Sequence, residues 1–125
     1  VAPRDVVEMQ ERRMEECIHA GLEAAGIGAD AVEKFVFAHS GDTLVDWERR
    51  KSSFGITVDR TTWEWGRGIG HMGSADQIAG LHHLVTSGEL RTGALVMLIG
   101  IGTGFTFGSV VLEALPAAAA VRAAA

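Results

Sequence analysis

A long uncharged segment, from Ala94 to Leu112, most constrains how this chain can fold. It is long enough to cross a bilayer as a single helix. Glycines at positions 100, 102 and 104 interrupt it, and apolar and polar residues alternate after them. A spanning helix has no need of these glycines, whereas two buried strands joined by a tight turn do. We therefore expect no membrane span but a strand over Leu95–Ile99, a turn over Gly100–Gly104 and a strand over Phe105–Glu113.

The rest of the chain alternates between helical and extended patterns. Apolar residues recur at helical spacing near the N-terminus, and short apolar runs are typical of buried strands. The predicted elements, in order, are a helix from a capping Asp5 to a stop at Gly26, a strand over Lys34–Ala38, a helix from Asp42 to about Lys51, an irregular stretch over 56–70 and a helix over Ser74–Ser87. This order predicts an α/β layered fold.

Composition narrows the expected partners and compartment. The chain has 125 residues, a net charge of −5 and one cysteine. The sequence has no basic patch with interleaved aromatic residues, so we do not expect nucleic acid as a partner. A single cysteine fits a reducing cytoplasm. Three strands make a sheet too thin to cover itself, so we expect a covering surface from another segment or chain. The start at Val1, with no signal-peptide pattern, suggests a fragment or processed piece.

The first candidate for chemistry is His39, which follows the predicted strand Lys34–Ala38 and precedes Ser40 and Gly41. Ligands in open α/β sheets bind outside the carboxyl ends of the strands. A histidine there can serve as a base or a hydrogen-bond donor. The alternative is a histidine that only caps the end of a strand, and His39 taken alone favours that alternative.

A second candidate is the pair His71 and Asp76, which stand where a glycine-rich stretch leads into a predicted helix. A carboxylate in the first turn can reach back and accept a hydrogen bond from the His71 ring. Such a bond fixes the tautomer and stabilises the imidazolium when the histidine takes a proton. The alternative is that Asp76 only complements the helix dipole, and the spacing does not decide between the two.

The glycine turn is a third candidate, through the main-chain amides of Gly102, Thr103 and Gly104. A strand follows it rather than a helix, so it is not a dinucleotide loop. Amides in such a turn can instead stabilise an oxyanion, although a plain tight hairpin explains the glycines equally well. The five histidines show no metal-ligand spacing, so we expect no metal site.

Three segments resemble the ketoacyl-ACP synthase III family of the thiolase superfamily. Lys34 to His39 (KFVFAH) resembles the strand that ends in the family's active-site histidine, and Gly70 to Ala75 (GHMGSA) resembles a segment that usually reads GNTSAA. The run from Ser87 to Ser109 resembles the last two strands and the glycine loop between them. The resemblance implies that residues 1–115 form the C-terminal portion of a thiolase-like layered fold, followed by an alanine-rich tail over 116–125. The family's nucleophilic cysteine lies in the N-terminal half, which this chain does not match.

Two departures from the family pattern bear on activity. The first site reads His39-Ser-Gly-Asp42 where the family has His-Gln-Ala-Asn, and His71 replaces the asparagine of the second site. In condensing members the His and Asn together stabilise an enolate. The pattern over 70–76 is instead similar to a divergent branch in specialised metabolism. Members of that branch move an acyl group through a Ser or Cys nucleophile with a His–Asp pair.

The resemblance therefore implies a cytoplasmic acyltransferase that takes its acyl group from an acyl carrier protein or coenzyme A thioester. His71 is expected as the general base, Asp76 as its orienting partner and His39 as a second donor or base. No metal or redox cofactor is implied, and the expected partners are the N-terminal part of the fold and a second copy in a homodimer. The alternatives are a decarboxylative 3-oxoacyl-ACP synthase using both histidines, and a non-catalytic thiolase-fold scaffold subunit.

Overall fold

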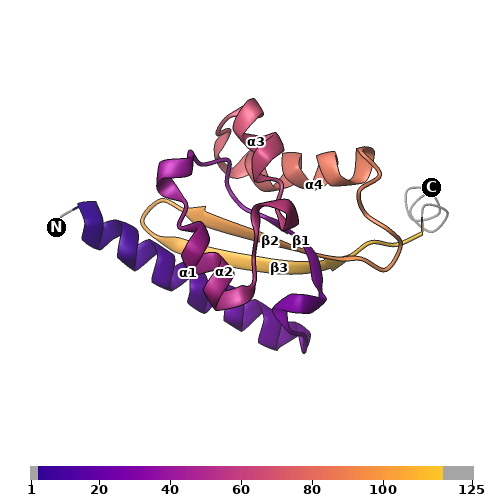
Figure 1. Cartoon of the computed structure of the whole chain (residues 1–125), viewed down its shortest axis with the longest axis horizontal. Helices are drawn as coiled ribbons and strands as arrows, with labels where there is room; N and C mark the ends of the chain where they lie inside the picture. The colour runs from indigo at the N-terminus through magenta and orange to yellow at the C-terminus, as the bar shows by residue number, and fades with distance from the viewer. Residues whose placement is uncertain (1–2, 117–125) are drawn as a thin grey trace.

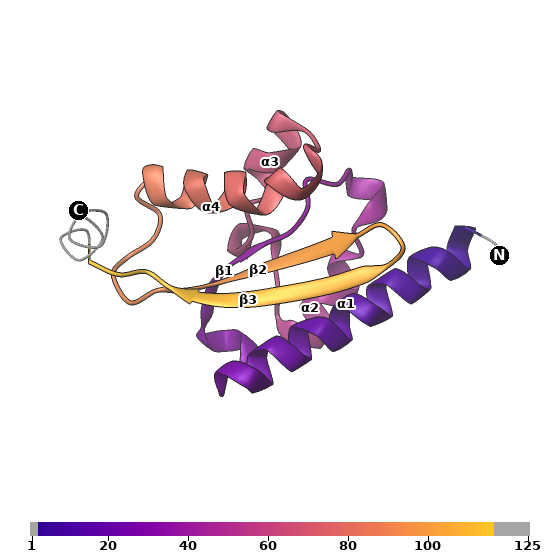
Figure 2. The same cartoon turned by 180° about the vertical axis from the view of Figure 1, so that it is seen from behind.

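The computed structural model describes residues 3–116, which form three layers (Figures 1 and 2). A long helix, α1 (Pro3–Ala25), lies along one face of a three-stranded sheet, and α4 (Asp76–Thr86) lies on the other face. Two short helices, α2 (Trp47–Phe54) and α3 (Trp63–Ile69), complete the layers. The predicted α/β layered arrangement is confirmed. The alanine-rich tail beyond Pro116 and the start at Val1 lie outside the described residues.

The sheet has the order β1-β2-β3, with β1 (Val32–Val36) parallel to β2 (Leu95–Gly102) and β3 (Thr106–Glu113) antiparallel to β2. The predicted hairpin is thus confirmed, but its turn is shorter than predicted. Gly100 pairs with Gly108 inside the ladder, and the turn occupies residues 103–105. Glycine keeps both main-chain hydrogen-bonding groups, so it can continue a ladder that side-chain patterns alone would end.

Every helix within residues 3–116 is too short or too polar to span a bilayer.

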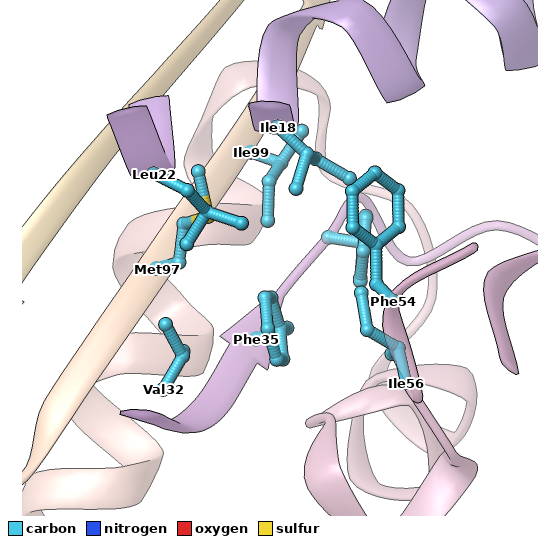
Figure 3. Packing of buried hydrophobic residues seen from close by; sticks show 9 residues of the cluster. Ile18, Leu22, Val32, Phe35, Phe54, Ile56, Met97 and Ile99 are labelled. Carbon is cyan, nitrogen blue, oxygen red and sulfur yellow. The ribbon is translucent and has the colours of Figure 1, made fainter. Parts of the chain in front are cut away.

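The core lies on both faces of the sheet because alternate strand residues point to opposite sides. In β1, Phe35 faces α1 and α2, whereas Val36 faces α4. Figure 3 shows Phe35 among the side chains of the larger cluster. That cluster comprises Ile18, Leu22, Val32, Phe35, Phe37, Phe54, Ile56, Met97 and Ile99, and the smaller one comprises Val36, Leu84, Val96 and Leu98. Both faces of β1 and β2 are covered, as their apolar sequences predict.

The helices differ from prediction in two places. The helix expected from Asp42 begins at Trp47, because Asp46 caps it: a side-chain oxygen of Asp46 accepts a hydrogen bond from the Arg49 amide at 3.0 Å. The stretch 56–70, expected to be irregular, contains α3, so that prediction was wrong. Glycine disfavours helix by about 1 kcal/mol per residue, but packing of a buried face overrides this propensity.

Candidate active site

The three predicted polar residues lie together at one end of the sheet. His39 follows the end of β1, His71 lies between α3 and α4, and Asp76 is the first residue of α4. The prediction that β1 ends directly before His39 was wrong, since the strand stops at Val36. The short segment after Val36 nevertheless carries His39 to α4. There the Asp76 side chain, which is 0% exposed, contacts both histidines.

Asp76 accepts hydrogen bonds from three groups. Its Oδ2 accepts from the main-chain N–H of His39 at 2.8 Å and from the His71 ring at 2.6 Å, and its Oδ1 accepts from the Met72 N–H at 2.7 Å. Burial raises the pKa of Asp76, but these hydrogen bonds outweigh burial and the net pKa is lowered. Asp76 is therefore an ionised, buried acceptor at neutral pH.

The contact predicted between His71 and Asp76 is present. The ring nitrogen Nδ1 faces the carboxylate, which can only accept, so Nδ1 carries the hydrogen. This tautomer leaves Nε2 as the basic nitrogen, on a side chain that is 63% exposed. Such an arrangement fits a general base whose orientation a carboxylate fixes.

His39, by contrast, is enclosed. Its side chain is only 1% exposed, and its Nδ1 lies 3.1 Å from the main-chain oxygen of Gly70 and 3.5 Å from Asp76 Oδ1. The ring lies edge to face with Trp65, at 5.5 Å between centroids. On another side it meets Gly66, where an added Cβ would lie 2.5 Å from the ring.

A hollow of about 420 Å³ opens beside the two histidines. His39 and His71 contribute to its wall, together with Thr103 of the hairpin turn. Of the three residues predicted to form an oxyanion loop, Thr103 and Gly104 lie in the turn, whereas Gly102 closes the ladder opposite Thr106. The expectation that Gly102 belongs to the turn is corrected accordingly, because its backbone continues β2.

Sequence reasoning missed Arg50, which also lines this hollow. Its side chain is buried, with the guanidinium 4.1 Å from the centre of the Phe37 ring and 3.8 Å from the Glu11 carboxylate. Burial lowers the pKa of Arg50. The sequence predicts a helix from Asp42 to about Lys51, but the adjacent Arg49 and Lys51 gave no local reason to single out Arg50 as the buried one.

The two tryptophans of α3, Trp63 and Trp65, are packing residues. Trp63 is buried, donates its ring N–H to the Ser40 oxygen at 2.8 Å and lies against Trp47. Trp65 stacks on His83 at 4.3 Å between ring centroids. They hold α3 against the segment that carries His39.

Among residues 3–116, no three His, Cys, Asp or Glu side chains are grouped so that they could hold a metal ion.

Comparison with known proteins shows which family this chain resembles in sequence. Residues 22–114 match the model described as 3-oxoacyl-[acyl-carrier-protein] synthase III, C-terminal. The β-ketoacyl-[acyl-carrier-protein] synthase III of Chelativorans sp. (strain BNC1) is 31% identical over 94 residues, covering 71% of this chain and 27% of that protein. The synthase III of Brucella anthropi is 28% identical over 115 residues, covering 88% of this chain and 33% of its own length.

Solved structures agree with this match. ChlB3, described as an acyltransferase, superposes with a TM-score of 0.77 at 30% identity, over 86% of this chain and 32% of its own. The FabH synthase III of Pseudomonas aeruginosa PAO1 gives 0.73 at 22% identity, over 90% of this chain and 35% of its own, a likeness that shows the thiolase fold alone. The chain therefore spans about a third of its relatives, and it belongs to the 3-oxoacyl-ACP synthase III family, as a C-terminal part of that thiolase fold.

Proposed function

We propose that this chain is part of an acyltransferase of specialised metabolism. It moves an acyl group from an acyl carrier protein or coenzyme A thioester, through a Ser or Cys acyl-enzyme, to a small-molecule or polyketide acceptor. The observation that carries the proposal is the 2.6 Å contact between His71 Nδ1 and a fully buried carboxylate. It presents a basic Nε2 to the exterior, as an acyl-transfer base requires. The similarity to ChlB3, described as an acyltransferase, supports the same reaction class.

The proposed chemistry has two half-reactions with the same base. In the first, His71 Nε2 takes the proton of the nucleophile, whose oxygen or sulfur attacks the thioester carbonyl. Asp76 stabilises the resulting imidazolium, which returns the proton to the departing thiolate. In the second, Nε2 takes the proton of the acceptor, which attacks the acyl-enzyme, and the imidazolium gives that proton to the Ser or Cys that leaves. Main-chain amides of the turn at Thr103 and Gly104 are the proposed supports for the oxyanion.

The nucleophile is proposed to lie on the N-terminal part of the fold, in the same protein or a separate polypeptide. An apolar face formed by Ile69, Met72, Ile78 and Val85 supports this assignment, because all four side chains are exposed in the described structure. The face borders a hollow lined by α3 and α4 and adjoins His71. A segment that covers it also brings its residues close to the His71 ring. The complete protein is proposed to act as a cytoplasmic homodimer.

A second candidate function is decarboxylative condensation by a 3-oxoacyl-ACP synthase. The curated relatives in Chelativorans and Brucella carry the name of that enzyme, and His39 and His71 lie in one site as this reaction requires. Formation of a ketoacyl product with loss of carbon dioxide selects this function. Transfer of the intact acyl group to an acceptor selects acyl transfer.

The test of the proposed function is the intact mass of the complete protein before and after incubation with an acyl thioester. We expect an acyl mass on the polypeptide that carries the nucleophile, and a fall of about 10²–10⁴-fold in its rate of formation in His71→Ala. The exposed His19 on α1, outside both hollows, supplies the matched control, since His19→Ala keeps the rate. A His71→Ala variant that folds and transfers at a near wild-type rate would show that His71 is not the base.

A further inference from the structure

The Nε2 edge of the His39 ring is buried and lies against Gly66 of α3. The Nε2 atom is buried and has no hydrogen-bond partner among residues 3–116. A Cβ at Gly66 would lie 2.5 Å from ring carbon Cδ2 and 3.0 Å from Nε2, so α3 already touches that edge of the ring. An acid or base must come within about 2.6–3.2 Å of the atom that exchanges the proton. With the side chain only 1% exposed, Nε2 offers a substrate oxygen almost no accessible surface in the described residues.

The opposite side of His39 is fully engaged with the segment that carries His71. In the tautomer with hydrogen on Nδ1, the ring donates to the main-chain oxygen of Gly70, the residue directly before His71. The main-chain N–H of His39 donates to Asp76 Oδ2, the same oxygen that accepts from the His71 ring. His39 therefore fixes both the residue before His71 and the carboxylate that orients it.

We propose that His39 is a positioning residue, which acts through its Nδ1–H and main-chain N–H and not through Nε2. This inference rests on the proposed function, in which His71 is the base, and it reverses the donor or base role expected from the sequence. The two histidines then have different roles, because His71 moves the proton and His39 holds His71 in place. Groups that orient metal-bound histidines typically contribute 10–100-fold to activity, and we expect an effect of the same size from His39.

The experiment compares two variants that each imitate one ring nitrogen. The amide nitrogen of asparagine in His39→Asn takes the place of Nδ1 and can still donate to the Gly70 oxygen, but nothing replaces Nε2. The longer His39→Gln places its amide near Nε2 and leaves the Gly70 oxygen without its donor. We expect His39→Asn to keep kcat/KM within about fivefold of the wild type, with an unchanged pH profile, and His39→Gln to lose about 10–100-fold.

A role for Nε2 in proton transfer predicts the opposite order. His39→Asn would then lose about 10²–10⁴-fold. That result, or equal losses in both variants, overturns the inference. Thermal unfolding of both variants separates loss of fold from loss of position.

A readout independent of turnover is the NMR titration of the His71 ring in the complete protein. Its midpoint stays at the wild-type position in His39→Asn and shifts in His39→Gln if His39 positions His71, and an unmoved midpoint in both overturns the inference. Should the wild-type protein form no acyl adduct, the proposed function fails, and the titration still decides whether His39 holds His71.

Discussion

At the scale of single residues, Asp76 is the group on which the site depends. Its carboxylate is fully buried and joins the end of β1, the turn before α4 and the His71 ring. A buried carboxylate with hydrogen-bond donors around it is stable only while ionised, because protonation removes an acceptor from donors that no water replaces. The same residue therefore serves both the fold and the proposed base.

Stability should accordingly depend on pH through Asp76. Its folded pKa lies below the ordinary value of 3.8, so its contribution is complete above that value and is lost as pH falls through the lower folded pKa. We expect Asp76→Asn to lower the free energy of unfolding by about 2–4 kcal/mol at pH 7, and by less as pH falls below 4. Urea unfolding across this range measures both. Asp42→Asn at an exposed carboxylate is the control, and a pH-independent cost at Asp76 contradicts the account.

At the scale of elements, α3 shows how close contact with the segment that carries His39 selects glycine. Gly66 lies inside the helix and is buried against His39, whereas Gly68 in the same helix has nothing within 4 Å of an added Cβ. Both have ordinary helical backbones, so they differ only in what surrounds them. Comparing Gly66 with Gly68 therefore distinguishes two effects of glycine: its low helix propensity, which both share, and the space that Gly66 leaves for the His39 ring.

Alanine at these two positions should act in opposite directions. We expect Gly66→Ala to destabilise the protein by about 1–3 kcal/mol, because the new methyl group overlaps the His39 ring. Gly68→Ala should be neutral or stabilise by up to about 1 kcal/mol, since alanine restricts the unfolded chain. Thermal unfolding of both variants measures the difference. Equal effects at the two positions would mean that α3 does not press on His39.

Elements set by neighbouring residues could be predicted from the sequence, whereas those set by contacts between distant residues could not. The hairpin and α4 could be predicted because apolar periodicity and glycine turns are local signals. The contact between His71 and Asp76 could be predicted for the same reason, since five positions on the chain separate them. Neither α3 nor the buried Arg50 could be predicted, because each depends on residues distant in sequence: Gly66 on His39, and Arg50 on Phe37.

At the scale of the whole molecule, β1 and β2 are covered on both faces, whereas β3 and the layer of α3 and α4 remain exposed. Ile78 and Val85 of α4 are 64% and 63% exposed, and Ile69 and Met72 extend the same apolar face. Large contiguous apolar patches on a protein surface mark interaction sites. The chain spans about a third of its relatives, and the proposed N-terminal part of the fold is the segment that we expect to cover this face.

A charge on this face should therefore impair assembly without unfolding the chain. We expect Ile78→Glu to weaken association with the remaining part of the protein by tenfold or more, because the carboxylate would be buried without a partner. The unfolding free energy of the chain itself should change by less than about 0.5 kcal/mol, as is usual at exposed positions. Leu115→Glu, equally exposed but outside the α3–α4 face, is the control. Unchanged co-purification of Ile78→Glu would place the covering segment elsewhere.

The shared oxygen of Asp76 also ties the proposed reactive arrangement to the local opening equilibrium of the protein. His39 and His71 both contact Asp76 Oδ2, so they share a partner while the segment after β1 is docked on α4. Proteins open locally at far lower free energy than they unfold. Substitutions that loosen this docking deplete the reactive arrangement before they deplete the folded population, so inactivation on heating should precede the loss of helical signal.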